Sequence, residues 1–432
     1  MVQQLIGSSE LAPSNQEFSR RRLLRWSAGC AALGCALPGR TLFAGEEDRE
    51  AKQISENRRL KIASVKTFLL RHKLSRALGA SISVPLSPTR ETLLVRIQSD
   101  SGLVGWGETA PIGGARGAIE QHLAPMLVGR NPLEYRRLWR DMWGANFGNA
   151  LAVGAVETAI NDLRGKALGL SVAELFGGRM RDKVPAYVSA LNYVEGREIE
   201  EEYPAVAADM VKRGFKAIKM RLGRFSIARE SAVAAKVREV VGPSVRLMAD
   251  GNGAYTPGSA LRMGHVLHDL NFHFFEEPLP QAPRYAGYEE LRQKMPLPLA
   301  AGEVIDSRAT AKDLIDRRCM DLIQPDVSLC GGLGEVLFIA EMAALSGIGC
   351  IPHAWGGDIV LAASVQLLSI MADPHWGLPT DTPLLELDQS ENPWRDGLAV
   401  KPLEVQDGSV LVPQGSGLGI EINEEVVKQY AV

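Results

Sequence analysis

Residues 245–304 read VRLMADGNGAYTPGSALRMGHVLHDLNFHFFEEPLPQAPRYAGYEELRQKMPLPLAAGEV, and this stretch decides the fold class. It holds three apolar runs, and each run leads into an acidic residue, namely Asp250, Glu276 or Glu303. Helix-like patterns separate the runs, so the three acids recur 26 and then 27 residues apart. A strand followed by a helix at this spacing is the βα unit of a parallel sheet. The stretch therefore predicts neighbouring parallel strands whose carboxylates meet at one edge.

The same alternation of strand and helix continues on both sides of this stretch. The predicted strands are VPAYVSAL (184–191), FKAIKMRLG (215–223), VRLMADGN (245–252), FHFFEEPLP (272–280), LPLAAGEV (297–304), DLIQPDV (321–327), IGCIPHAW (348–355) and PLLELD (383–388). Seven strand–helix units followed by a last strand indicate an α/β fold, a (β/α)7β barrel of the TIM type. We assign residues 184–394 to this barrel, with an open doubly wound sheet as the alternative.

Residues 60–183 have a different pattern and are predicted to form an α+β domain. Residues 61–70 and 91–108 alternate as strands do, and the Ser-Asp-Ser-Gly of residues 99–102 marks a hairpin turn. Apolar residues at intervals of three and four then predict helices at residues 118–129, 132–143 and 150–169. Strands and helices in separate blocks are typical of the α+β class.

The composition excludes some classes of function. The chain has 432 residues, a net charge of -3 and a pI near 6.2, so it has no basic field that would attract nucleic acid. Its partners are predicted to be small molecules or further copies of the same chain. Cys319, Cys330 and Cys350 lack the number and spacing of a disulfide framework or a thiolate metal site. We expect them to be buried free thiols.

Residues 1–44 are predicted to be an export signal. Residues 19–25 read SRRRLLR, and an uncharged stretch of small and apolar residues follows. This order is typical of a signal peptide, and the adjacent arginines before two leucines resemble a twin-arginine signal. Residues 45–59 are charged and are predicted to be a linker, so we expect a periplasmic protein without a permanent membrane span. A lipoprotein anchor at Cys35 and an ordinary amphipathic helix are the alternatives.

Polar residues gather where the predicted barrel strands end. The second to the eighth strands end in Lys219 and Arg221, Asp250 and Asn252, Glu276 and Glu277, Glu303, Asp326, His353, and Glu386. In a parallel barrel these ends share one rim, and that rim carries the chemistry. One charged residue after a strand merely begins a solvated loop, but seven such strands in succession indicate a site.

Three of these acids are predicted to hold a metal ion. Asp250, Glu276 and Glu303 come from three neighbouring strands, so their carboxylates are expected to converge. Carboxylate oxygens without thiols favour a hard octahedral cation such as Mg²⁺, with Mn²⁺ as a substitute. Without a metal the three anions would repel one another and raise one another's pKa. Three separately solvated acids are the alternative.

Asp326 and His353 end adjacent predicted strands, which allows a hydrogen bond between them. Such a bond fixes the tautomer of the imidazole and raises its basicity, as a general base needs. A histidine on an apolar strand is more often structural, but here it lies in a Pro-His-Ala-Trp context at a strand end. The sequence therefore indicates a catalytic base with an orienting carboxylate.

This ordered series of motifs resembles the enolase superfamily and, within it, the mandelate racemase subgroup. The resemblance runs from the GWGE of residues 105–108 to the LELD of residues 385–388. It implies that the domain of residues 60–183 caps the barrel with loops at residues 72–86 and 108–116 that touch the distal end of the substrate.

The resemblance extends to the end of the chain and to the assembly. It implies that residues 395–432 return to the capping domain and that the protein forms a homo-oligomer, either a dimer or an octamer. Arg76 and Arg116 of the capping loops could pair with a second substrate carboxylate, although solvated loop residues are the alternative for both.

The resemblance assigns roles around the metal by motif. Asp250, Glu276 and Glu303 match the family's magnesium ligands, and Lys219 matches the first position of its K-x-K motif. Glu386 matches a glutamate that donates a hydrogen bond to the enolate oxygen, which requires a protonated carboxyl group.

The remaining assignments concern the base and the substrate. His353 and Asp326 match the catalytic dyad of the subgroup. Arg221 departs from the commonest pattern, because many members carry a second lysine there as a base on the other face of the substrate. Arginine is a poor base but an excellent partner for a carboxylate. Arg221 and Asn252 are therefore predicted to bind substrate.

These assignments imply magnesium-dependent removal of the proton α to a carboxylate through an enediolate. Dehydration of a sugar acid to a 2-keto-3-deoxy acid is the first interpretation, because it needs only one base and one acid. Racemisation or epimerisation needs a second base, which Arg221 does not supply. Cycloisomerisation and an exported binding protein without turnover are further alternatives, the last disfavoured by the complete ligand set and dyad.

Overall fold

The computed structural model describes residues 59–145, 149–373 and 383–432. The predicted signal peptide and all but the last residue of the predicted linker lie outside these residues, so export stays a prediction. Within the described ranges, no helix combines the length and the apolar character that crossing a membrane requires.

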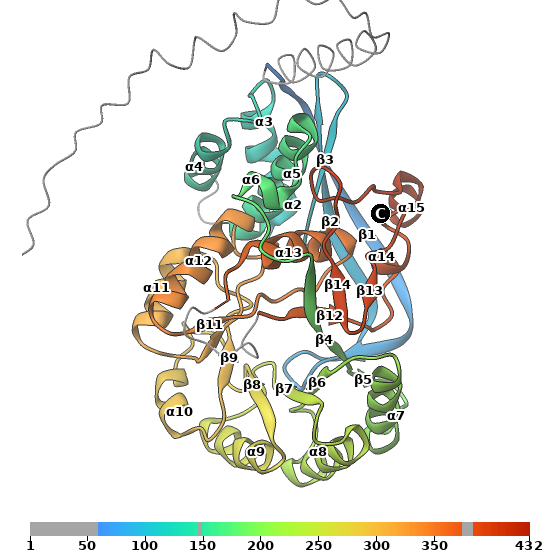
Figure 1. Ribbon diagram of the computed structural model, residues 1–432, viewed down its shortest axis with the longest axis vertical. Helices are drawn as coiled ribbons and strands as arrows, with labels where there is room; N and C mark the ends of the chain where they lie inside the picture. The colour runs from blue at the N-terminus through green and yellow to red at the C-terminus, as the bar shows by residue number, and fades with distance from the viewer. Residues whose placement is uncertain (1–58, 146–148, 374–382) are drawn as a thin grey trace, which may run out of the picture. The chain divides into compact units, whose positions relative to one another are not determined.

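Eight parallel strands form the C-terminal half of the described chain (Figure 1). They pair in the order β12, β4, β6, β7, β8, β9, β10, β11. Their bounds are β4 Lys183–Leu191, β6 Ala217–Arg221, β7 Arg246–Asp250, β8 Phe272–Glu276, β9 Leu299–Ala301, β10 Leu322–Ile323, β11 Gly349–Cys350 and β12 Leu385–Asp388. This is the strand order of a (β/α)7β barrel, as the sequence predicts.

One helix follows each of the first seven barrel strands. The helices are α7 Ile199–Lys212, α8 Ile227–Val241, α9 Pro257–Asp269, α10 Tyr288–Lys294, α11 Arg308–Asp316, α12 Leu333–Leu345 and α13 Asp358–Ile370. Alternate strand residues point to opposite faces, so one set packs against these helices. The other set fills the barrel interior with Tyr187, Ala217, Met248, Phe274, Ala300, Ile351 and Leu384. These side chains pack together as a largely apolar core.

The N-terminal half contains an antiparallel sheet covered by helices on one face. Its strands are β1 Ile62–Gly79, β2 Ser87–Ser99, β3 Val104–Thr109 and the short β5 Tyr193–Val194, in the order β3-β2-β1-β5. The helical segments are α2 Ala115–Ala118, the π-helical turn η1 Ile119–Leu123, α3 Ala124–Leu127, α4 Tyr135–Ala145, α5 Ala150–Leu168 and α6 Val172–Leu175. Gly107 allows α5 to pack directly on β3, because a Cβ there would lie 1.9 Å from the Ala155 carbonyl oxygen.

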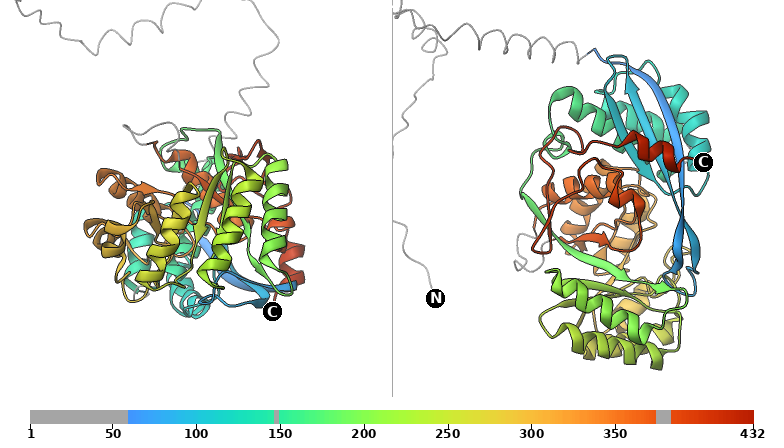
Figure 2. Two further views of the ribbon diagram at one scale, coloured as in Figure 1. Left: turned by 90° about the horizontal axis from the view of Figure 1, so that it is seen from below. Right: turned by 90° about the vertical axis from the view of Figure 1, so that its right-hand side faces the viewer.

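The C-terminal segment returns from the barrel to the N-terminal sheet. It contains α14 Pro393–Asp396, β13 Val405–Gln406, β14 Ser409–Leu411 and α15 Glu424–Tyr430. β14 pairs with β4 of the barrel, whereas the backbone N–H of Val432 donates to Leu69 of β1 at 2.9 Å. Figure 2 shows this end of the chain beside β1. The segment therefore joins the two halves.

The structure corrects several details of the sequence analysis. β1 extends to Gly79, so only the second half of the predicted loop 72–86 is a loop. Arg76 donates to the Glu195 carbonyl oxygen at 3.1 Å, and Arg116 pairs with Glu120 at 3.0 Å within α2 and η1, so both arginines already have partners in the protein.

The predicted sixth and seventh strands are also shorter than expected. β10 and β11 have two residues each, and Asp326 and His353 lie three residues beyond them. Proline explains both early ends, because Pro325 and Pro352 cannot donate to a strand ladder. Cys319 and Cys330 are buried free thiols, whereas Cys350 is half-buried.

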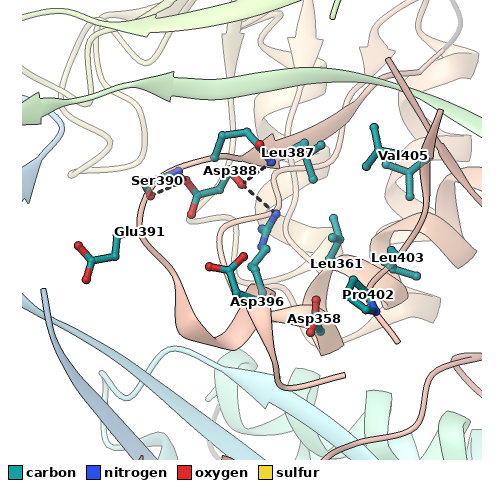
Figure 3. Close-up of a pocket in the computed structure, with 13 residues that line it drawn as sticks. Asp358, Leu361, Leu387, Asp388, Ser390, Glu391, Asp396, Pro402, Leu403 and Val405 are labelled. Atoms are coloured by element: carbon teal, nitrogen blue, oxygen red, sulfur yellow. Dashed lines mark hydrogen bonds between the residues drawn. The ribbon is translucent and has the colours of Figure 1, made fainter. Parts of the chain in front are cut away.

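A cavity of about 310 Å³ lies behind the barrel rim, where α13 meets the C-terminal segment (Figure 3). Asp358 and Asp396 lie on its wall. Burial raises the pKa of Asp358 to about 7, and the negative charges of Glu108 and Asp396 add to the rise against the attraction of Arg395. Asp358 nevertheless accepts a hydrogen bond from Ala399 N at 2.8 Å, which holds the C-terminal segment.

This carboxyl group is expected to make stability depend on pH. Because its pKa is higher folded than unfolded, its stabilising contribution is complete below about pH 4 and is lost as the pH rises to about 7. In Asp358→Asn, which keeps the acceptor but cannot ionise, the fall in unfolding free energy between pH 5 and 8 is expected to be smaller by about 1 kcal/mol or more. Urea denaturation at several pH values measures this, and parallel profiles for variant and wild type would contradict it.

Candidate active site

Lys219 lies at the centre of the charged rim. Its Nζ is 2.7 Å from Glu276 Oε1, 2.8 Å from Glu386 Oε1 and 3.3 Å from Asp250 Oδ2. The register of the sheet explains this convergence, because Asp250 is paired with Glu276 on β8 and with Arg221 on β6. Burial opposes the charge of Lys219, but the three carboxylates outweigh it and raise the pKa of its ammonium group. Lys219 is therefore positively charged.

Arg221 lies at the end of the same strand and is bound to the protein rather than free. Its Nη1 donates to Asp250 Oδ2 and to Asn252 Oδ1, the latter at 2.8 Å. Its Nη2 lies 3.5 Å from Ser189 Oγ. Burial is again outweighed by carboxylates, Asp250 foremost, and the pKa of the guanidinium rises. Arg221 is therefore a fixed cation and no base.

Asp326 and His353 form the predicted hydrogen bond. His353 Nδ1 is 2.6 Å from Asp326 Oδ2, and Asp326 Oδ1 accepts from Ser328 N at 2.6 Å and from its Oγ at 2.7 Å. This leaves His353 Nε2 directed toward the acids, 3.4 Å from Glu303 Oε2 and 3.8 Å from Glu386 Oε2. The arrangement is that of an imidazole whose outer nitrogen is held in place by a buried carboxylate.

The same acids control the charge of His353. Burial opposes its protonation, but Glu303, Glu386 and Asp326 together raise the pKa of His353 to about 10. The imidazole is therefore protonated at neutral pH in this arrangement. To act as a base it needs further positive charge beside Glu303 and Glu386, which would lower its pKa.

Of the three predicted metal ligands, Asp250 and Glu276 are buried and Glu303 is partly exposed, and the pKa shifts of the three carboxyl groups differ. Burial and the neighbouring Asp250 raise the pKa of Glu276 to about 8, whereas burial is the main cause that raises the pKa of Glu303. Asp250 shows the opposite shift, because Arg221 and Lys219 outweigh its burial and lower its pKa. Crowded carboxylates in low dielectric thus resist full ionisation, as expected of a site that lacks enough positive charge.

Glu386 does not have the environment that the sequence analysis expects. Burial would raise the pKa of its carboxyl group, but Lys219, His353 and Arg221 outweigh burial and lower it. Glu386 is therefore ionised rather than protonated in this arrangement. Neither of its oxygens has a well-oriented hydrogen-bond donor among the described residues, although Lys219 Nζ is close. The charge of this carboxyl group depends on cations contributed by other strands, and its proposed role as a hydrogen-bond donor stays a prediction.

The donor chemistry of Asp250, Glu276 and Glu303 fits a hard divalent cation, because all three are carboxylate oxygen ligands and the pKa values of Glu276 and Glu303 are raised in the absence of further positive charge. The present orientations of these three side chains, however, do not form a metal site. In the part of the chain that the structure describes, no three His, Cys, Asp or Glu side chains form a ready metal cage. The protein's own cations explain this, since Arg221 engages Asp250 and Lys219 engages Glu276. The assignment of the three acids as ligands stays a prediction.

Several residues of the rim were missed in the sequence analysis. Gln324 donates to Glu276 Oε2 at 2.9 Å, and Trp355 lies against Arg90 and Arg221 with the guanidinium carbons 4.7 and 5.4 Å from its ring centre. Gln324 lies two residues before Asp326, so strand alternation could have placed both on one face. Arg90 had no such signal, because it comes from β2 in the other half of the chain.

Two protein-family profiles match the chain over most of its length. Residues 64–177 match the family described as "Mandelate racemase / muconate lactonizing enzyme, N-terminal domain". Residues 202–426 match the family described as "Enolase C-terminal domain-like". The two matches cover both halves of the described fold in the expected order.

Individual relatives agree with these profiles. A D-galactarolactone cycloisomerase of Agrobacterium fabrum is 33% identical over 86% of this chain and 99% of its own length. An arabinonate dehydratase of Saccharolobus solfataricus is 31% identical over 79% of this chain and 90% of its own. Among solved structures, a mandelate racemase/muconate lactonizing protein from Paracoccus denitrificans in complex with magnesium has a TM-score of 0.73 and 29% identity, over 86% of this chain and 97% of that one.

Proposed function

Because this chain belongs to the mandelate racemase and muconate lactonizing enzyme family of the enolase superfamily, we propose that it is a lyase that dehydrates a sugar acid to a 2-keto-3-deoxy acid. The observation that carries the proposal is the 2.6 Å bond between Asp326 and His353, which directs His353 Nε2 toward Glu303 and Glu386. The relatives that dehydrate sugar acids support the same class of reaction.

The first step is removal of the proton α to the substrate carboxylate. His353 Nε2 accepts this proton, while Asp326 holds Nδ1–H and so keeps the ring in the required tautomer. Electrons of the broken C–H bond move onto the substrate carboxylate, where negative charge develops. Lys219 and Arg221 provide fixed positive charge beside it, without any reorganisation during the reaction.

The second step is loss of the β-hydroxyl group. The electron pair returns from the carboxylate, the C–O bond breaks, and a proton from His353 accompanies the hydroxyl as water in a syn elimination. Lys219 provides that proton instead if the hydroxyl leaves from the opposite face. The resulting enol becomes the 2-keto-3-deoxy acid by proton transfer. Arg221 favours elimination over racemisation, because its raised pKa excludes it as a base on the second face.

Cycloisomerisation is the second candidate function. It is favoured by the 33% identity with a D-galactarolactone cycloisomerase, which covers 99% of that relative. It begins with the same proton transfer to His353. The two functions differ in whether the product has lost water, and this difference can be measured directly.

We propose Mg²⁺ as the cofactor and Asp250, Glu276 and Glu303 as the residues that would hold it. When bound, it supplies positive charge to the substrate carboxylate and to the surrounding acids. The raised pKa of His353 supports this proposal, because without further positive charge nearby the imidazole is protonated at neutral pH and cannot accept a proton. The magnesium complex of the Paracoccus denitrificans protein is consistent with it.

Glu303→Gln is expected to weaken Mg²⁺ binding by about tenfold to a hundredfold. One charged ligand is replaced by a neutral amide of the same size, and hard cations prefer charged oxygens. Isothermal titration calorimetry measures the affinity. Asp162→Asn is the control, since Asp162 is a buried acid of α5 outside the rim. Equal affinity in Glu303→Gln and wild type would contradict the ligand assignment.

The function itself is tested by proton NMR in D₂O with Mg²⁺ and a panel of mono- and diacid sugars and their lactones. Loss of the α-proton signal together with new 2-keto-3-deoxy signals is the expected result. Product without loss of water would replace dehydration by cycloisomerisation. Exchange of the α-proton with retention of the hydroxyl would identify an epimerase and require a second base near Arg221.

A further inference from the structure

The two loops that carry Asp326 and His353 lead into helices that have no cap of their own. Asp326 lies between β10 and α12, and His353 lies between β11 and α13. Both helices begin after a glycine, Gly332 or Gly357, and neither glycine can offer a side-chain acceptor. The first backbone N–H groups of a helix have no partners inside it, so acceptors must come from elsewhere.

Glu108 supplies the acceptors for α13. This last residue of the GWGE motif lies on β3, in the half of the chain that precedes the barrel. Its Oε1 accepts from Gly357 N at 2.6 Å, and its Oε2 accepts from Val360 N at 3.1 Å. Thr92 of β2 donates to Oε1 at 2.8 Å and fixes the carboxylate. Glu108 is 2% exposed, so water does not replace these bonds.

Glu157 supplies the acceptors for α12 in the same manner. It lies on α5 and is fully buried. Its Oε2 accepts from Leu333 N at 2.9 Å, and its Oε1 accepts from Gly334 N at 3.1 Å and from Tyr135 Oη at 2.6 Å. Gly332 permits this approach, because a Cβ there would lie 2.3 Å from Glu157 Oε2. The loop after β10 is thus shaped to receive this carboxylate.

A third contact links the same half of the chain directly to the dyad. Thr109, next to Glu108 on β3, donates from Oγ1 to the Ser328 carbonyl oxygen at 2.8 Å. Ser328 in turn donates from its N and Oγ to Asp326 Oδ1 at 2.6 and 2.7 Å. Asp326 is bonded to His353 at 2.6 Å. Three side chains of the N-terminal half therefore hold the two loops from one side.

We propose that Glu108 and Glu157, together with Thr109, are positioning residues that set the distance and orientation between Asp326 and His353. This inference rests on the proposed function of His353 as the base. It assigns the N-terminal domain a part in placing the base, in addition to any contact with the substrate. A displacement of about 1 Å in a reacting group can lower the rate about a hundredfold, so small shifts of these loops have large effects.

Glu108→Gln and Glu157→Gln test the proposal without leaving a cavity where the N-terminal half contacts the barrel loops. Glutamine has the same size, but its NH₂ group faces a backbone N–H that needs an acceptor, so half of each cap is lost. We expect kcat to fall about tenfold to a hundredfold in each variant, with KM within about twofold of wild type. The fall in kcat is expected in the chemical step rather than in binding, because neither glutamate contacts the acids of the rim.

Asp162→Asn is the matched control. Asp162 is also a buried acid of α5, but it accepts from Trp106 N and Leu418 N at 2.9 Å and so holds β3 and the C-terminal segment. Its substitution is expected to lower the melting temperature while kcat stays within about twofold of wild type. If the two glutamates contributed to stability alone, Glu108→Gln and Glu157→Gln would behave like Asp162→Asn, with a lower melting temperature and a kcat close to that of wild type.

A second measurement needs no substrate. The ¹⁵N shifts of the His353 ring, assigned with His353→Asn, report its tautomer and its bond to Asp326. We expect these shifts to change in Glu108→Gln and Glu157→Gln and to remain at wild-type values in Asp162→Asn. Unchanged shifts in both glutamine variants would overturn the proposal, whether or not the wild type turns over any sugar acid.

Thr109→Val provides the same test if a glutamine variant fails to fold. It removes the hydroxyl that binds the Ser328 carbonyl oxygen and keeps the shape of the side chain. A change in the His353 ring shifts in this variant would support the proposal, and wild-type shifts would overturn it. Absence of turnover in the wild type, with these shift changes present, would refute only the proposed function.

Discussion

His353→Asn is expected to abolish exchange of the substrate α-proton, with a fall in rate of about 10²–10⁴-fold. Asparagine keeps a polar group of similar reach near Asp326 but cannot accept a proton at neutral pH. The charged rim is retained, so substrate and Mg²⁺ binding are expected to change little. The rate of deuterium incorporation in D₂O, followed by NMR, is the measurement.

The control for this prediction is His265→Asn, because His265 is an exposed residue of α9 outside the site. It is expected to exchange the α-proton at the wild-type rate. If His353→Asn retained more than about a tenth of the wild-type rate, another residue would be the base.

Lys219→Met is expected to lower the unfolding free energy by about 3–5 kcal/mol in metal-free protein. The change removes the buried cation that compensates Glu276 and Glu386 at 2.7 and 2.8 Å and leaves these buried acids without that positive charge. Catalysis is expected to fall as well, because Lys219 provides positive charge beside the substrate carboxylate. Chemical denaturation with and without Mg²⁺ measures the effect on stability.

Mg²⁺ is expected to restore part of the lost stability, since it adds positive charge to the same acids. Lys294→Met is the control, because Lys294 pairs with Glu290 on the surface and its side chain is 57% exposed. A surface pair of this kind contributes about 0–1 kcal/mol. Equal losses in the two variants would show that the charge of Lys219 is not needed to hold the rim together.

The barrel could be predicted from the sequence because its signals are local. The alternation of strand and helix in residues 245–304 can be recognised without reference to the rest of the chain. The ends of two strands differ from the prediction, since Pro325 and Pro352 end β10 and β11 before Asp326 and His353. The long β1 was also missed, because the extension of a strand depends on its partner, here β2, rather than on its own residues.

The sequence predicted which residues belong to the site, but it did not predict which of them carry a charge. The order of motifs was sufficient to gather Lys219, Asp326 and His353 at one rim. It did not reveal that Glu386 is ionised or that His353 is held as an imidazolium. Both states arise from burial and from cations or acids a few ångströms away on other strands, and no local pattern encodes those distances.

The fold class and the residues at the rim thus followed from the sequence, because periodicity and spacing act over a few residues at a time, and the family followed from the resemblance of its ordered motifs. The tertiary structure decided which of these groups touch, which carry charge, and what holds them. Glu108 and Glu157 show the difference most plainly, since each caps a helix more than 170 residues away in the sequence. Such contacts follow from the packing of two domains against each other, and packing is a property of the folded chain.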